Sequence, residues 1–222
     1  LGGDPMPMGT AGRDFDVYAA WLNEHGIRQD YISVLDDVFT AQAYITTDVD
    51  DNQIILFHPG AMNFSHVNKV GDVPNVSIGI ISPDGRTGML EHASQFYETK
   101  IPFIFDPGQG LPMFGRDELR RFIEQATWVT VNDYEWELLK KVTGWGINEL
   151  KNRVEALIVT RGASGSVIYT NQGDIEIPAA KPNIVNDPTG CGDAYRAGLL
   201  FGLMKTKDWL TVGRIASLMG AI

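Results

Sequence analysis

The residues best suited to chemistry lie in a glycine-rich turn, Gly190-Cys191-Gly192-Asp193, which opens an apolar stretch with helical spacing over 192–204. In such a turn, backbone N–H groups and the positive end of the helix dipole form a site for an anion. A carboxylate beside that site suits phosphoryl transfer: the site holds the migrating group while the carboxylate accepts the proton of the acceptor hydroxyl. Asp193 is also open to a plainer interpretation, as an acid that favours a helix start. That alternative does not explain the two glycines and a second acid, Asp187, before it.

The spacing of this turn excludes two common nucleotide-binding motifs. No Gly-Lys-Ser/Thr follows, so the turn is not a P-loop. No third glycine stands where the dinucleotide fingerprint requires one. Arg196 follows Asp193 by three residues and shares its helical face. It either steers phosphate or pairs with a nearby acid. Separately, Asp106 follows another predicted strand, where formation of a turn alone explains the Pro-Gly after it.

A second polar pair, Asn132 and Glu135, follows the predicted strand 128–131. Residues three apart at a helix start lie on one face of its first turn. The spacing favours a capping box, in which Asn132 caps the helix and Glu135 reaches back. The alternative is a pair that holds a hydrated magnesium ion, since Mg²⁺ keeps several waters and needs few protein ligands.

A third segment, Thr160-Arg161-Gly162-Ala163-Ser164-Gly165, follows the predicted strand 156–159. Its two glycines permit positive φ and the close approach of a ligand to the backbone. A simple turn within a β-hairpin explains them equally well.

These segments follow strand-like runs that alternate with amphipathic helical stretches. The patterns predict strands at 75–81, 102–105, 128–131 and 156–159, hairpins at 41–46 with 54–58 and at 165–170 with 174–177, and helices at 14–25, 116–126, 134–142, 148–154, 192–204 and 209–222. The alternation indicates an α/β fold whose mainly parallel sheet is covered on both faces, with a small β element beside it. Ligands of such sheets bind at the carboxyl ends of the strands.

Composition narrows the function classes. The 222 residues carry 18 Lys and Arg against 28 Asp and Glu, a net charge of −10, which argues against a nucleic-acid partner. The single cysteine, Cys191, allows no disulfide within the chain and favours a reducing, cytoplasmic location. No run of about 18 apolar residues is present, so we expect no membrane span.

Taken together, the three motifs resemble those of the PfkB family of carbohydrate and purine kinases, which includes ribokinase and adenosine kinase. The stretch 187–193, Asp-Pro-Thr-Gly-Cys-Gly-Asp, is similar to the family's C-terminal signature. Asn132-x-x-Glu135 resembles its magnesium motif, and Thr160-Arg-Gly162 with Gly165-Ser its nucleotide-contacting turn. The motifs follow the family's order, and the resemblance covers nearly the whole chain.

The resemblance implies a Rossmann-like, three-layer α/β/α core with a small β-sheet lid, and a kinase that uses ATP and Mg²⁺. Asp193 would be the catalytic base, and the N–H groups of residues 190–193 would hold the γ-phosphoryl group. Asn132 and Glu135 would position Mg²⁺. The other implied roles are nucleotide contacts for Asn132, Thr160, Arg161, Gly162 and Gly165, and a K⁺ site for Asp187 and Thr189. Gln42, on a strand of the predicted lid hairpin, is placed to contact the substrate, and a solvent-facing strand residue explains it equally well.

The implied organisation is a core of residues 1–37 and 61–222 with a lid hairpin at 38–60, whose exposed face would form a homodimer. The family's Gly-Gly-x-x-x-Asn signature has no counterpart before Leu1, and the C-terminal half of its adenine pocket has none after Ile222, so we expect a chain truncated at both ends. The implied reaction is phosphorylation of a nucleoside hydroxymethyl group, with adenosine favoured. The alternatives are a ribose or fructose kinase, a non-catalytic nucleotide-binding remnant, or another α/β enzyme whose turn only binds a phosphate ester.

Overall fold

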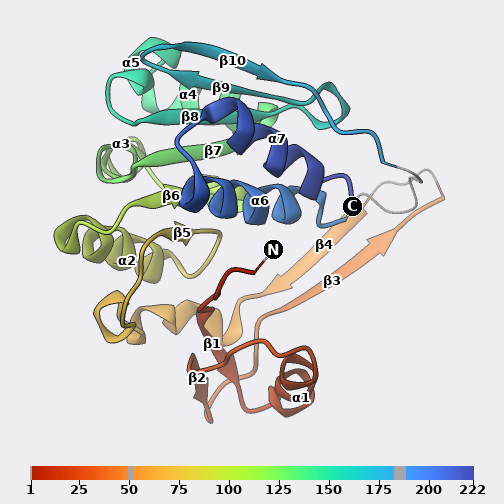
Figure 1. Ribbon diagram of the computed structural model, residues 1–222. Coiled ribbons are helices and arrows are strands. Elements are labelled where there is room, and N and C mark those ends of the chain that lie inside the picture. Colours follow the sequence, from red (N-terminus) through yellow and green to blue (C-terminus); the bar gives the residue numbers. More distant parts are fainter. Residues whose placement is uncertain (1, 50–52, 183–188) are drawn as a thin grey trace. The chain divides into compact units, whose positions relative to one another are not determined.

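The computed structural model describes residues 2–49, 53–182 and 189–222. The chain forms two compact units. The sheet unit consists of Leu1–Gly3, Val76–Pro83 and Phe96–Ile222, and the hairpin unit of Asp4–Asn75 and Asp84–Gln95. Figure 1 shows the helices and strands of both.

A six-stranded sheet is the centre of the sheet unit, with strand order β10-β9-β8-β7-β6-β5. Strands β5 to β8 run parallel, and β9 and β10 continue the sheet antiparallel. The predicted α/β class, with its mainly parallel sheet and its hairpin at 165–177, is therefore confirmed. The strands are β5 Gly79–Ile81, β6 Phe103–Phe105, β7 Trp128–Asn132, β8 Ala156–Thr160, β9 Ser166–Thr170 and β10 Gly173–Ile177.

Helices cover both faces of this sheet (Figure 1). One face carries the two C-terminal helices, and three other helices contact the opposite face. The pair consists of α6 Cys191–Lys205 and α7 Trp209–Met219; the three are α3 Arg116–Gln125, α4 Asp133–Thr143 and α5 Ile147–Lys151. Short 3₁₀ turns, η3 Gly108–Met113 and η4 Gly162–Ser164, lie in connections between these elements.

The alternation of side chains along the strands holds the layers together. Ile104 of β6 joins an apolar cluster with Ile158 of β8 and Leu199 of α6. The next residue, Phe105, faces the opposite layer and stacks on Phe122 of α3 at 4.4 Å between ring centroids. All five side chains are buried. Each such burial contributes about 1.5–3 kcal/mol relative to exposure, so the sheet is fixed between two helical layers.

The hairpin unit contains two separate two-stranded sheets. Strands β1 Met8–Gly12 and β2 Tyr31–Leu35 pair in parallel across α1 Asp16–Glu24, and β3 Gln42–Thr47 pairs antiparallel with β4 Gln53–His58. The hairpin predicted at 41–58 is therefore confirmed. Two 3₁₀ helices and the start of a long α-helix complete the unit: η1 Gly60–Val67, η2 Val70–Asp72 and α2 Arg86–Thr99, which ends in the sheet unit.

Four details differ from the sequence-based expectation. The helix expected at 148–154 spans only Ile147–Lys151. The pair β1–β2 was not predicted. The strand expected at 75–81 forms only over Gly79–Ile81, since it pairs with just three residues of β6. The last helix ends at Met219. No helix in the described ranges has both the length and the apolar character of a bilayer-spanning segment.

Candidate active site

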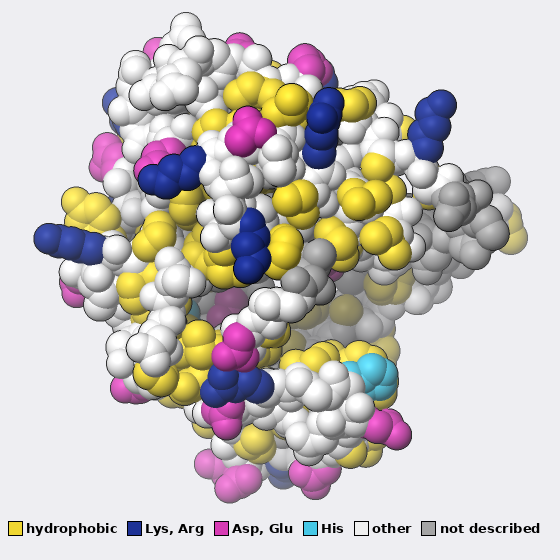
Figure 2. Space-filling model, viewed as in Figure 1, with side chains coloured by type: hydrophobic (Ala, Val, Ile, Leu, Met, Phe, Trp, Pro, Cys, Tyr) yellow, Lys and Arg dark blue, Asp and Glu magenta, His cyan; other side chains and the backbone are white. Residues whose placement is uncertain are grey.

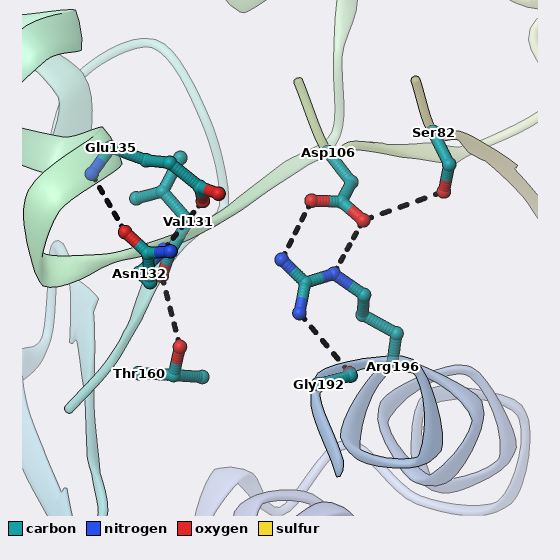
Figure 3. A network of polar contacts seen from close by, with 8 residues as sticks. All are labelled: Ser82, Asp106, Val131, Asn132, Glu135, Thr160, Gly192 and Arg196. Carbon is teal, nitrogen blue, oxygen red and sulfur yellow. Dashed lines mark hydrogen bonds and ion pairs between the residues drawn. The ribbon is translucent and has the colours of Figure 1, made fainter. Parts of the chain in front are cut away.

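The carboxyl ends of the four parallel strands meet at one edge of the sheet. Asp106 follows β6 directly and Ser82 follows β5, in a register that pairs Phe105 with Ile81. Asn132 and Thr160 end the next two strands and are themselves register partners. Figure 3 shows their side chains near the first turn of α6. The topology therefore gathers polar residues from four strands at the edge where ligands of such sheets bind.

Asn132 and Glu135 form the predicted capping box at the start of α4. The Glu135 amide donates to Asn132 Oδ1 at 2.7 Å, and the Asn132 amide donates to Glu135 Oε2 at 2.8 Å. Burial raises the pKa of Glu135, and the nearby Asp106 carboxylate acts in the same direction. The box leaves Glu135 Oε1 outside it. Burial makes the charged form of the Glu135 carboxyl costly, and a cation bound nearby would stabilise that form. A hydrated Mg²⁺ keeps most of its water ligands, so one carboxylate with a neighbouring amide is enough to hold it.

The glycine turn after β8 combines both interpretations considered above. Gly165 has φ of +84°, and a Cβ there would lie 2.1 Å from the Ile177 carbonyl oxygen, so the hairpin itself requires glycine. Gly162 has φ of +53°, and no atom lies within 4 Å of the place a Cβ would take. Arg161 is held to Glu176 of β10 at 2.5 Å. Gly162 therefore offers open backbone to a ligand, while Gly165 and Arg161 shape the turn.

Helix α6 begins at the predicted anion site. Gly190, the N-cap, has φ of +82°, and its carbonyl accepts the first helical bond from Ala194 at 2.8 Å. Cys191, Gly192 and Asp193 form the exposed first turn, whose N–H groups have no acceptor within a helix. This end of α6 therefore has the donors and the dipole that an anion requires.

Two further residues of the signature stand before this helix. Thr189 is exposed. Asp187, the other residue assigned to the cation site, lies outside the described residues.

An ion pair joins α6 to the sheet edge (Figure 3). Arg196 donates from Nε to Asp106 Oδ2 and from Nη2 to Asp106 Oδ1 at 2.8 Å, and its Nη1 donates to the Gly192 carbonyl at 3.1 Å. Ser82 adds a weaker contact to Asp106 at 3.4 Å. Of the two interpretations of Arg196, pairing with an acid is therefore the one observed. The sequence singled out Arg196 and Asp106 separately, but it did not predict the contact between them, because they stand 90 positions apart.

The electrostatics of this pair are set by its burial. Burial raises the pKa of Asp106, an effect that Arg196 opposes and the Asp193 carboxylate reinforces. Burial also disfavours the charged form of Arg196, but Asp106 more than offsets this, so its pKa is raised. Three carboxylates, Asp106, Glu135 and Asp193, thus act on one guanidinium.

Gln42 is the one predicted site residue that belongs to the hairpin unit. Its amide nitrogen donates to Asp14 at 3.2 Å, and the Tyr44 hydroxyl donates to its oxygen at 2.6 Å. Asp14 in turn accepts from the amide and hydroxyl of Thr40, which lowers the pKa of Asp14. The carboxamide of Gln42 is therefore oriented by its own unit.

Comparison with known proteins identifies close relatives. The sequence profile described as pfkB family carbohydrate kinase matches residues 1–222. A nucleoside kinase of Methanocaldococcus jannaschii is 35% identical over 221 residues, which are 98% of this chain and 72% of that protein. The structure of Burkholderia thailandensis nucleoside kinase in complex with inosine is 50% identical, with a TM-score of 0.95 over 100% of this chain and 73% of that one. The crystal structure of the M. jannaschii enzyme matches with a TM-score of 0.88 over 96% of this chain and 72% of that one.

Proposed function

Because the chain belongs to the pfkB family of carbohydrate kinases, enzymes that phosphorylate a hydroxyl group, we propose that it transfers the γ-phosphoryl group of ATP to the 5′-hydroxymethyl group of a purine nucleoside. Among nucleosides, adenosine and inosine are the candidates. The relative solved with inosine, and with ADP and inosine, is 50% identical to this chain. A yeast adenosine kinase is 26% identical over 93% of it. The observation that carries the proposal is the exposed first turn of α6, with Asp193 at the carboxyl edge of the sheet.

The proposed mechanism uses residues of this edge. The N–H groups of residues 190–193 hold the γ-phosphoryl group, and Asp193 accepts the proton as the nucleoside oxygen attacks phosphorus. The bond to the bridging oxygen breaks and ADP leaves. Thr160, Gly162 and Gly165, with Arg161, shape the wall for the nucleotide. When bound, Mg²⁺ would neutralise charge on the phosphates, and Asn132 and Glu135 would hold it through its water ligands. Asp187 and Thr189 are proposed to hold K⁺.

The hairpin at 38–60 is proposed to be a lid over the substrate, with Gln42 as a substrate contact. It exposes apolar side chains on both faces: Tyr44 and Leu56 form one cross-strand pair, and Ile45 and Phe57 project from the other face. Such exposure suits an element that closes over a ligand on one face and meets a second copy on the other. Of Leu56→Asp and Phe57→Asp, we expect one to dissociate a homodimer in sedimentation analysis and the other to raise the nucleoside KM. If neither variant has either effect, the lid assignment is wrong.

The decisive experiment is a phosphorylation assay with ATP, Mg²⁺ and adenosine, inosine, cytidine, ribose or fructose, followed by mass spectrometry of the products. We expect a nucleoside monophosphate. 5′-Deoxyadenosine is the matched control, because it lacks only the acceptor oxygen and should inhibit without being phosphorylated.

A ribose or fructose kinase is the second candidate, favoured by a ribokinase of Lactococcus lactis that is 27% identical over 80% of this chain. Phosphorylation of a free sugar but of no nucleoside would establish it. Nucleotide binding without any transfer would identify a non-catalytic protein.

A further inference from the structure

The Asp106–Arg196 pair includes a third contact, to the backbone of α6, that neutralisation of the two charges does not require. Its guanidinium uses all three nitrogens, two for the Asp106 carboxylate and one for the backbone carbonyl of Gly192. A bidentate arginine–carboxylate contact fixes the guanidinium plane as well as the charge. The third contact therefore ties the first turn of α6 to the carboxyl end of β6.

The ion pair that holds this contact is buried, although the first turn itself is exposed. The side chain of Arg196 is 13% exposed and that of Asp106 is 4% exposed. A Cβ at Gly192 would lie 3.1 Å from Arg196 Nη1, closer than a side chain usually tolerates. A side chain at position 192 would therefore require the end of Arg196 to shift by a few tenths of an ångström, and Asp106 holds that end in place. The glycine of the signature and the arginine one helical turn later form one structural device.

We propose that Arg196, held by Asp106, is a positioning residue for phosphoryl transfer: it fixes the first turn of α6, and with it the N–H groups and Asp193, relative to the sheet edge. This inference rests on the proposed function of that turn. A displacement of about 1 Å in a catalytic group can cost about 10²-fold in rate. The device should therefore act on kcat much more than on nucleoside binding.

The experiment must separate an effect of Arg196 on the position of the first turn of α6 from an effect on the stability of the protein. Removal of one member of a buried ion pair leaves an uncompensated charge, whereas replacement of both by apolar residues of similar size is often neutral for stability. The informative protein is therefore the double variant Asp106→Leu/Arg196→Met, compared with Arg196→Met alone. Lys151→Met is the matched control, because it breaks the 2.5 Å ion pair with Asp174 elsewhere in the sheet unit.

We expect Arg196→Met to lose both thermal stability and activity. In the double variant the melting temperature should return to near that of the wild type. Its kcat should stay about 10²-fold low, with the nucleoside KM within about threefold of the wild-type value, since the substrate contacts are retained. Hydrogen exchange of the amides at 194–197, whose acceptors are the carbonyls of 190–193, should be faster than in the wild type. Lys151→Met should leave kcat and this exchange unchanged.

If the folded double variant keeps the wild-type kcat or the wild-type exchange rate at 194–197, Arg196 does not position the turn. The two proposals fail in different ways. If the wild type phosphorylates no acceptor while exchange at 194–197 still rises in the double variant, the kinase assignment is wrong and the anchoring of α6 remains. If the wild type is active and the double variant matches it in both readouts, the kinase assignment remains and the positioning role is wrong.

Discussion

Substitution of Asp193 by asparagine separates the two interpretations of this residue, because they predict effects of different size. Asp193 is exposed in the first turn of α6. If it only favours the helix dipole, loss of its charge costs at most about 1 kcal/mol of stability. For a domain of this size that is a fall of about 2–4 °C in melting temperature, with little change in turnover.

If Asp193 is the base, the same substitution should lower kcat about 10²–10⁴-fold, or about 2.7–5.4 kcal/mol of activation free energy at about 1.36 kcal/mol per tenfold change. The N–H groups of the turn are retained and a negative charge is removed. ATP should therefore bind at least as tightly as to the wild type.

The assay is a coupled measurement of ADP release with the best nucleoside, beside a melting curve and an ATP titration for each variant. Asp117→Asn is the control, since Asp117 is an exposed acid in the first turn of α3 and should show only the small stability effect. An Asp193→Asn protein that turns over within fivefold of the wild type would refute the assignment of the base.

Three further predictions concern the same edge of the sheet. Glu135→Gln keeps an acceptor for the capping box but removes a carboxyl whose pKa is raised by burial. The wild type loses the stability that this group contributes as pH rises through the raised pKa, so the melting temperature of the variant should rise relative to that of the wild type between pH 4.5 and pH 8. If Glu135 helps hold Mg²⁺, the variant should also need a higher Mg²⁺ concentration for activity. ATP with Mg²⁺ should slow alkylation of Cys191, the chain's single and exposed cysteine, and equal rates with and without nucleotide, followed by mass spectrometry, would place the nucleotide elsewhere. Gly165→Ala should destabilise the protein by about 1–3 kcal/mol in urea unfolding, from backbone strain at φ of +84° and from the clash with the Ile177 carbonyl, whereas Gly162→Ala should cost less.

The sequence predicted best those elements whose apolar pattern matches their burial. Strand β7 is apolar and buried along most of its length, and the Asn-x-x-Glu spacing after it forms the predicted cap. Strand β1 escaped prediction because its residues, Met-Gly-Thr-Ala-Gly, include two glycines and show no alternation. Its pairing with β2 depends on the tertiary fold, where Gly12 lies so close to Phe39 that a Cβ would contact the backbone at 2.2 Å.

The candidate site shows the same limit. Local spacing was enough to find Asn132 with Glu135 and the turn at 190–193, because each motif lies within one helical turn. The partner of Arg196 could not be found in this way, since Asp106 stands 90 positions earlier and its pairing follows from strand order. The different roles of the two glycines after β8 could not be predicted from the sequence either, because only the contact with Ile177 distinguishes Gly165 from Gly162.

The charge of the chain makes the arrangement at α6 easier to understand. A net charge of −10 opposes the approach of a triphosphate. On the face seen in Figure 2, Lys and Arg side chains stand apart from one another rather than in one basic patch. Arg196, the cation beside the turn, is already engaged by Asp106 and lies within the field of Glu135 and Asp193. Besides the proposed Mg²⁺, attraction for a phosphate at this edge would come from backbone N–H groups and the helix dipole, which act over short distances and only when correctly oriented. A site that binds phosphate through oriented N–H groups rather than through net charge depends on where the first turn of α6 is placed. We therefore expect the Asp106–Arg196 pair to matter more for catalysis than for stability.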